Sequence, residues 1–125
     1  MGKVNPTVEE VEAFGQSAPA GPVAMLNLMR FKSGVDPQAF FAELAKLNAP
    51  FLERAEAQVL YRGEAGPDFA GDESWDVTIL VQYPSFSAFA GLVTDSAWLE
   101  TAGELRLRSL EDAKLIVTFP PAAEE

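Results

Sequence analysis

The chain has 125 residues, 48% of them hydrophobic and 10% aromatic, which suits one globular domain with a single core. It contains no Cys and no His, so disulfides, thiol nucleophiles and the common ligands of zinc and haem are excluded, and we expect no metal site and no cofactor. Nineteen acidic residues against nine basic ones give a net charge of −10, so we expect neither nucleic acid nor an anionic membrane as a partner.

The sequence carries no sign of a targeting or membrane segment. Its apolar runs fall short of the roughly 20 residues that a membrane span needs, and the N-terminus lacks a basic stretch followed by a hydrophobic one. We therefore expect a cytoplasmic protein whose acidity serves solubility.

The N-terminal 21 residues predict a short helix followed by a linker. Thr7 and Glu10 have the spacing of a capping box, in which both side chains bind free amides at a helix start. We expect residues 1–21 to be an appendage, residues 22–120 to form the domain, and residues 121–125 to be a flexible tail.

The first half of the domain predicts a strand, a long helix and a second strand. Residues 22–31 alternate in the manner of a strand. Asp36 is placed to cap a helix with Pro37 at its first position, and Pro50 is expected to kink or break that helix. Residues 57–63 predict the second strand.

The second half repeats this order from its strongest strand signal, residues 75–83, which are rich in β-branched and aromatic side chains. A helix is expected to begin at Ser85, which reads as a helix cap and not as a nucleophile, and a further helical stretch covers residues 96–109. Residues 114–119 predict the last strand. The acids Asp72, Glu73 and Asp76 fit a solvated turn better than a calcium loop.

The predicted order is strand, helix, strand, strand, helix, strand. This order is typical of the ferredoxin-like split β-α-β fold of the α+β class, with a four-stranded antiparallel sheet and helices on one of its faces.

Alternation along the strands divides the sheet residues into two sets. The apolar set, expected against the helices, is Ala24, Leu26, Leu28, Val59, Tyr61, Val77, Ile79, Val81, Leu115 and Val117. The mixed set, expected on the opposite face, is Met25, Asn27, Met29, Gln58, Leu60, Arg62, Asp76, Thr78, Leu80, Gln82, Ile116 and Thr118. Because the second set is too apolar for open water, we expect a two-fold homodimer with facing sheets. Its interface should include Asn27, Thr78, Leu80 and Gln82.

Four motifs, in matching order, resemble domain-of-unknown-function family 1330 over about residues 20–120. They are Met25–Phe31, Val59–Gly63, Trp75–Asp76 with Val81–Ser85, and Arg106–Ile116. The resemblance implies the ferredoxin-like dimeric α+β barrel superfamily and implies no particular activity. The chain departs from the family at Trp98, where relatives tend to have Tyr, and at Glu104–Leu105, where many have His.

Five residues are candidates for a ligand site: Asn27, Tyr61, Trp75, Tyr83 and Arg106. The guanidinium of Arg106 could hold a carboxylate in two places, and the favoured alternative is a salt bridge to an acid, namely Asp76, Glu104 or Asp112.

Each of the other candidates also has a simpler interpretation. Asn27 could orient a ligand, but pairing with its symmetry mate or with Gln82 in the dimer is favoured. The three aromatic residues are expected on the helix-facing side, where packing in the core is the simpler role.

Two functions remain open at this point. The first is a binding module for a small carboxylate or carbonyl compound, and the second is a cofactor-independent enzyme of oxygenase, isomerase or lyase type. No catalytic residue can be assigned from the sequence.

Overall fold

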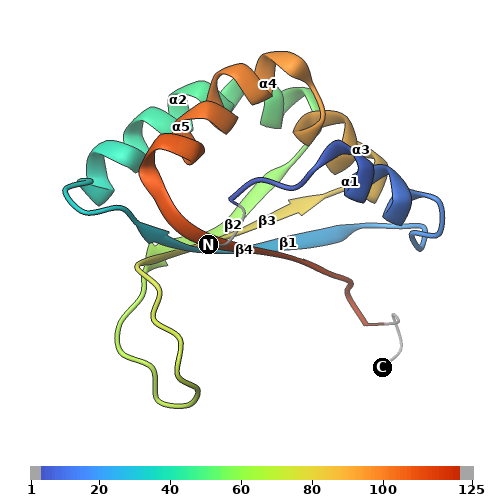
Figure 1. Cartoon of the computed structure of the whole chain (residues 1–125). Coiled ribbons are helices and arrows are strands. Elements are labelled where there is room, and N and C mark those ends of the chain that lie inside the picture. The colour runs from blue at the N-terminus through green and yellow to red at the C-terminus, as the bar shows by residue number, and fades with distance from the viewer. Residues whose placement is uncertain (1–3, 122–125) are drawn as a thin grey trace.

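A computed structural model describes residues 4–121 (Figure 1), so all but the first residue of the tail expected at 121–125 lies outside the described residues. Its sheet consists of β1 (Val23–Phe31), β2 (Gln58–Glu64), β3 (Val77–Tyr83) and β4 (Leu110–Thr118), in the spatial order β2-β3-β1-β4 with every pair antiparallel. With the helices between the strands, this confirms the predicted ferredoxin-like α+β fold.

All helices of the described chain lie on one face of the sheet (Figure 1). They are α1 (Val8–Gly15), α2 (Pro37–Arg54), α3 (Phe86–Val93), α4 (Ser96–Glu100) and α5 (Ala102–Ser109). The opposite face, which we call the open face, carries no helix, and the loop 65–76 projects on its side (Figure 1). Among residues 4–121, no helix is long and apolar enough to cross a membrane.

The helix starts follow from their capping residues, as predicted. The capping box of Thr7 and Glu10 is present at α1, Asp36 accepts a hydrogen bond from the amide of Ala39, and Ser85 accepts one from the amide of Ala88. Pro50, in contrast, lies within a continuous α2 and does not break it.

The helical stretch predicted at 96–109 forms two helices instead of one. The backbone leaves the helical region at Thr101 (φ −116°, ψ −83°) and re-enters it at Ala102. Gly103 allows the two helices to pack closely, because a Cβ atom there would lie 3.3 Å from Cζ3 of Trp98.

The segment predicted to be an appendage packs on the domain. Val11 of α1 is 5% exposed and belongs to the core. The ring of Phe14 packs edge-to-face on Phe86 of α3, with 4.9 Å between centroids. The helix therefore buries its short apolar stripe in the same core as the other helices.

The alternation of β1 is opposite to the prediction. Met25 and Met29 are buried against the helices, and Asn27 lies between them on the same side. Leu26 and Leu28 lie on the open face, paired with Leu80 and Thr78 of β3. The two faces of this strand are almost equally apolar, so the sequence of the strand does not determine which face packs against the helices. A shift of one residue exchanges the two sets of side chains.

A bulge in β2 produces a second difference. Val59 pairs with Val81 but Tyr61 pairs with Leu80, so Leu60 is an extra residue. The bulge places Tyr61 on the open face and turns Arg62 toward the helices, where it lines a cavity.

An apolar row crosses the centre of the open face. The strand register aligns Tyr61, Leu80, Leu26 and Ile116, one from each strand. Tyr61 is 58% exposed and Ile116 is 41% exposed.

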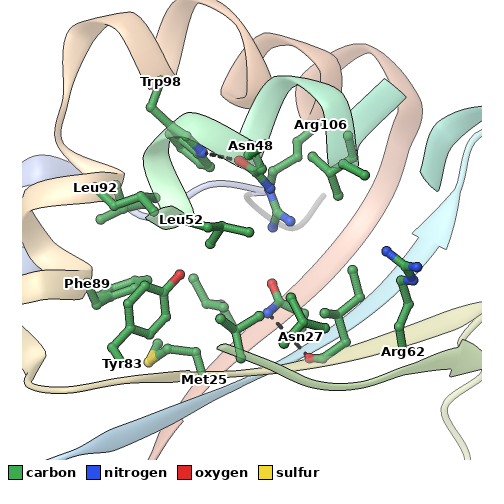
Figure 2. Close-up of a pocket in the computed structure, with 18 of the residues that line it drawn as sticks. Met25, Asn27, Asn48, Leu52, Arg62, Tyr83, Phe89, Leu92, Trp98 and Arg106 are labelled. Atoms are coloured by element: carbon green, nitrogen blue, oxygen red, sulfur yellow. Dashed lines mark hydrogen bonds between the residues drawn. The ribbon is translucent and has the colours of Figure 1, made fainter. Parts of the chain in front are cut away.

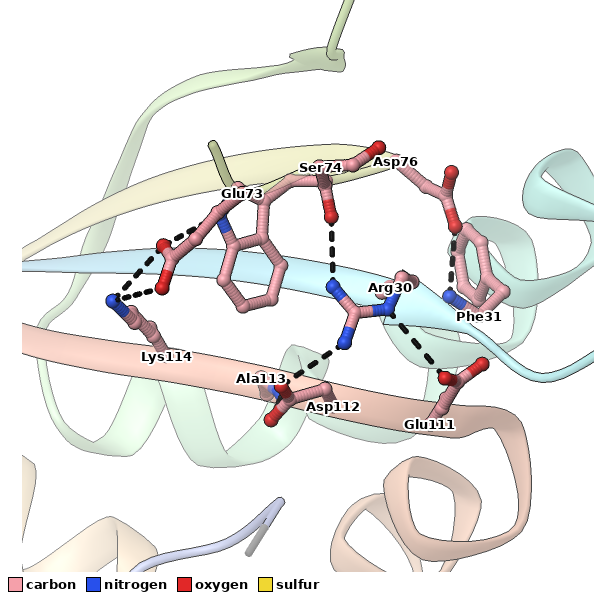
Figure 3. Close-up of polar contacts among 10 residues, drawn as sticks. Arg30, Phe31, Glu73, Ser74, Asp76, Glu111, Asp112, Ala113 and Lys114 are labelled. Carbon is pink, nitrogen blue, oxygen red and sulfur yellow. Dashed lines mark hydrogen bonds and ion pairs between the residues drawn. The ribbon is translucent and has the colours of Figure 1, made fainter. Parts of the chain in front are cut away.

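Arg30 secures the end of the loop 65–76 on this face (Figure 3). Its guanidinium donates to the carbonyl of Ser74 at 2.8 Å, pairs with Asp112 at 3.1 Å and lies 5.2 Å from the ring centroid of Trp75. Nearby, Lys114 pairs with Glu73 at 2.9 Å and thereby lowers the pKa of that carboxyl. Trp75 therefore lies on the open face, not against the helices as predicted.

Candidate functional site

A cavity of about 230 Å³ lies between the sheet and helices α2 to α5 (Figure 2). Most of its wall is apolar, from Met25 of β1, Leu44 and Leu52 of α2, and Phe89 and Leu92 of α3. The polar side chains that line it are Asn27, Asn48, Arg62, Tyr83, Trp98 and Arg106. A mainly apolar wall with a few converging polar groups is typical of small-molecule sites.

Arg106 of α5 is a buried cation at this cavity. The residue is 5% exposed, and burial lowers the pKa of its guanidinium from 12.5 to about 10, so it stays charged at neutral pH. A lowering of this size corresponds to about 3 kcal/mol of unfavourable charge burial. Such a cost is normally offset by an acid beside the cation.

No acid fills that role among residues 4–121. The guanidinium donates to Oδ1 of Asn5 and to the carbonyl of Val4, each at 2.8 Å, and the hydrogen-bond partner of its Nη1 within residues 4–121 is Sδ of Met29, at 3.7 Å. The salt bridge favoured by sequence reasoning is therefore wrong. Figure 2 shows the guanidinium directed into the cavity.

Tyr83 at the end of β3 supplies a hydroxyl to the same space. Its ring packs edge-to-face on Phe89, with 5.4 Å between centroids, and Figure 2 shows the hydroxyl directed into the cavity. Burial raises the pKa of this phenol to about 12, and the positive charge of Arg106 opposes the increase. The hydroxyl is therefore a proton donor throughout the physiological range.

Two amides also belong to the polar lining. Asn48 of α2 accepts a hydrogen bond from the indole Nε1 of Trp98 at 2.7 Å, which fixes both side chains. Asn27 of β1 donates to the carbonyl of Ile79 at a long 3.5 Å, and its side-chain oxygen faces the cavity (Figure 2). Asn27 is therefore not on the open face with Thr78, Leu80 and Gln82, where the dimer prediction placed it.

Arg62 adds a second positive charge at the exposed edge of the cavity. Its guanidinium carbon lies 5.6 Å from the ring centroid of Phe41 on α2. The described lining thus holds two arginines and no Asp or Glu, in a chain with a net charge of −10. Such a lining favours an anion.

The structure brings together three of the five predicted ligand residues, Asn27, Tyr83 and Arg106. Tyr61 and Trp75 lie on the other side of the sheet. Sequence reasoning missed Asn48 and Arg62. Asn48 interrupts the apolar stripe of α2, a signal that could have revealed it, whereas Arg62 depends on the bulge in β2.

The described lining offers hydrogen-bond donors but no carboxylate, imidazole or thiol. Among residues 4–121, no group of three or more acids could hold a metal ion. The cavity can therefore bind and polarise a carbonyl or carboxylate oxygen, but its lining contains no conventional general base.

No protein-family model matches this chain, and neither does any curated protein, so membership of family 1330 stays a prediction. The chain is similar to the solved structure of RPA0582, a protein of unknown function from Rhodopseudomonas palustris. That match has a TM-score of 0.81 and 29% identity, and covers 97% of this chain and 98% of the other.

Two more distant structures share the fold. A ferredoxin-like DABB family protein from Mesorhizobium loti matches with a TM-score of 0.58 and 10% identity, over 82% of this chain and 99% of the other. A dimeric ferredoxin-like protein of unknown function from Thermobifida fusca matches with a TM-score of 0.55 and 9% identity, over 82% and 94%.

Proposed function

We propose that this protein binds a small carboxylate or carbonyl compound in the cavity between its sheet and its helices. The observation that carries the proposal is the buried guanidinium of Arg106, which faces the cavity and has no acidic partner within residues 4–121. A bound carboxylate would supply the missing negative charge through charge-assisted hydrogen bonds.

Tyr83 and Asn48 support this assignment. The protonated hydroxyl of Tyr83 can donate to a carbonyl or carboxylate oxygen, and Asn48 keeps its amide donors after accepting the bond from Trp98. The apolar wall would hold the carbon skeleton of the ligand.

The alternative of a cofactor-independent enzyme is supported less well by the same residues. Arg106 and Tyr83 could stabilise a developing oxyanion, but a reaction that begins with proton removal also needs a base, and the described lining has no carboxylate or imidazole. A binding module requires only the groups that are present.

Replacement of Arg106 tests the proposal directly. A panel of acetate, butanoate, benzoate and phenol is titrated calorimetrically into the wild type, Arg106→Met and Arg108→Met. Arg108 lies on the same helix and pairs with Glu43 at the surface, which makes it a matched control. A charge-assisted hydrogen bond contributes about 1.5–3 kcal/mol, so Arg106→Met should weaken carboxylates by roughly ten- to a hundredfold, and Arg108→Met should not.

Two results would overturn the proposal. One is a wild type that binds no carboxylate, neither in this panel nor among longer straight-chain acids. The other is a folded Arg106→Met variant that keeps its carboxylate affinity, since the guanidinium would then serve only to hold Val4 and Asn5.

We further propose that two copies of the chain pair through their open faces, as a dimeric α+β barrel of domain-of-unknown-function family 1330. The apolar row of Tyr61, Leu80, Leu26 and Ile116 supports the pairing, because a two-fold axis through its centre would bury the row against itself. The four family motifs and the ferredoxin-like fold support the family assignment.

A further inference from the structure

A second cavity, of about 420 Å³, lies under α1 beside the one that holds Arg106. Its wall is mostly apolar, with Val11 and Phe14 from α1, Phe86 from α3 and Val117 from β4. The carboxyl-bearing Glu10 also lines it, and no arginine or lysine of the described chain does. The space therefore suits an apolar group.

The two cavities share a wall of four apolar side chains. Pro6, Met25, Phe89 and Leu115 line both of them. Met25 is unbranched and adaptable, so a change of its rotamer can open this wall at low cost. The first cavity alone is smaller than the roughly 300–1,000 Å³ of typical ligand sites, and the two joined together fall within that range.

Arg106 lies at the junction of the two spaces. Its side chain lines the first cavity, whereas its hydrogen-bond partners, Val4 and Asn5, line the second. When a negatively charged head group is bound at Arg106, the rest of the ligand can therefore extend through apolar surroundings, past Met25 and Phe89 and under α1.

We infer that the ligand is an amphipathic carboxylate, with its head group on Arg106 and an unbranched apolar tail in the cavity under α1. The inference rests on the proposed function for the head group and adds the tail. It makes α1, predicted to be an appendage, a wall of the binding site.

A chain-length series tests the tail. Butanoate, hexanoate, octanoate and decanoate are titrated below their micelle concentrations, and the fluorescence of Trp98 reports binding in a Trp75→Phe background, where it is the sole tryptophan. Each additional methylene that is buried in the cavity should lower Kd about fourfold. Octanol, which lacks the charge, should bind at least tenfold more weakly than octanoate.

A bulky side chain in the second cavity should weaken the binding of the long-chain acids and leave that of the short-chain acids unchanged. Ala113 lines this cavity only, so Ala113→Phe should leave the Kd of butanoate within twofold and weaken octanoate and decanoate at least tenfold. Ala45 lines the first cavity only, and Ala45→Leu should instead weaken every member by a similar factor. Val117→Phe, at another position of β4, fills the same cavity and replaces Ala113→Phe in this test if that variant does not fold.

The outcomes distinguish failure of the proposed tail site from failure of the proposed head-group site. Octanoate binding that Arg106→Met weakens, but that neither Ala113→Phe nor Val117→Phe weakens, would overturn the inference and leave the proposed function intact. Equal affinity along the series would do the same. A wild type that binds no carboxylate at all would overturn both.

Discussion

Arg106 and Asn5 are 101 positions apart, yet Nε of Arg106 donates to Oδ1 of Asn5 at 2.8 Å. The amide nitrogen of the same Asn donates to the carbonyl of Gly103 at 3.1 Å and Arg106 also donates to the carbonyl of Val4, so three hydrogen bonds join the N-terminal segment to α5. These bonds hold the planar guanidinium in one orientation, with Nη1 left to the thioether of Met29 and to the cavity. The segment before α1 therefore positions the charge of the site.

Asn5→Ala should lower both stability and ligand affinity. The change leaves a buried guanidinium donor without its acceptor, at a cost of about 1–3 kcal/mol, or roughly 4–12 °C in Tm. Carboxylate affinity should fall about three- to tenfold, because the guanidinium is less well oriented. Thermal unfolding and calorimetric titration of the same samples measure the two effects.

Thr7→Ala is the matched control for that change. It removes the exposed capping box of α1 and costs about 1 kcal/mol, but it does not touch Arg106. Its Tm should fall while its affinity stays the same. An Asn5→Ala variant that behaves in this way would show that Asn5 is structural only.

Tyr83→Phe should lower the affinity for the ligand without lowering the stability of the fold. The ring and its contact with Phe89 remain, and no hydrogen bond from the hydroxyl to residues 4–121 is lost. A hydrogen bond to a charged carboxylate contributes about 1.5–3 kcal/mol, so its loss predicts a roughly ten- to hundredfold weaker Kd, with a Tm no lower than that of the wild type. Unchanged affinity would show that the hydroxyl of Tyr83 does not bind the ligand.

Carboxylate affinity should be constant from pH 7 to 9 and should fall as the pH rises through about 10. Burial lowers the pKa of Arg106 to about 10, so the guanidinium loses its proton there, and an anion binds only the charged form. The decline should approach tenfold per pH unit once the pH exceeds the pKa of Arg106 in the ligand-free protein. Titrations in steps up to pH 10.5 measure it, and Arg106→Met should show no such decline.

Stability is a poor readout for the same titration, because two buried groups act in opposite directions. The lowered pKa of Arg106 means that the unfolded chain binds more protons above pH 10, so this group adds stability as the pH rises. Tyr83, whose pKa is raised from 10 to about 12, binds its proton more tightly in the folded chain and removes stability over the same range.

The sequence predicted the fold because its local signals agree with one another. Strand β3 has one face of Val77, Ile79 and Val81, and the caps Asp36 and Ser85 start the helices that follow β1 and β3. Each of these signals depends on neighbouring residues only, so it can be recognised without the tertiary structure.

The site was harder to predict because it depends on which way two strands face. Strand alternation placed Asn27 with the mixed set on the open face, whereas the structure places it at a cavity between sheet and helices, where a polar amide can be accommodated. The bulge at Leu60 similarly exchanges the faces of Tyr61 and Arg62. The contact of Asn5 with Arg106 joins the two ends of the chain, and no local pattern signals it.

Leu80→Asp should convert a dimer into a monomer. Leu80 lies at the centre of the open face, in the apolar row with Tyr61, Leu26 and Ile116. In a dimer with facing sheets, the new carboxylates of both copies would be buried close together with no base between them, at a cost of several kcal/mol. Light scattering should therefore give the wild type a mass of twice 13.5 kDa, and the variant a mass of 13.5 kDa.

Leu107→Asp is the matched control for the dimer. Leu107 is a 49% exposed leucine on α5, on the helical side of the sheet, so its replacement should leave the dimer mass unchanged. Circular dichroism of Leu80→Asp should retain the mixed helix and strand signal, which separates dissociation from unfolding. The pairing of open faces would be contradicted by a wild type with the mass of one chain, or by a Leu80→Asp variant that remains a dimer as stable as the wild type on dilution.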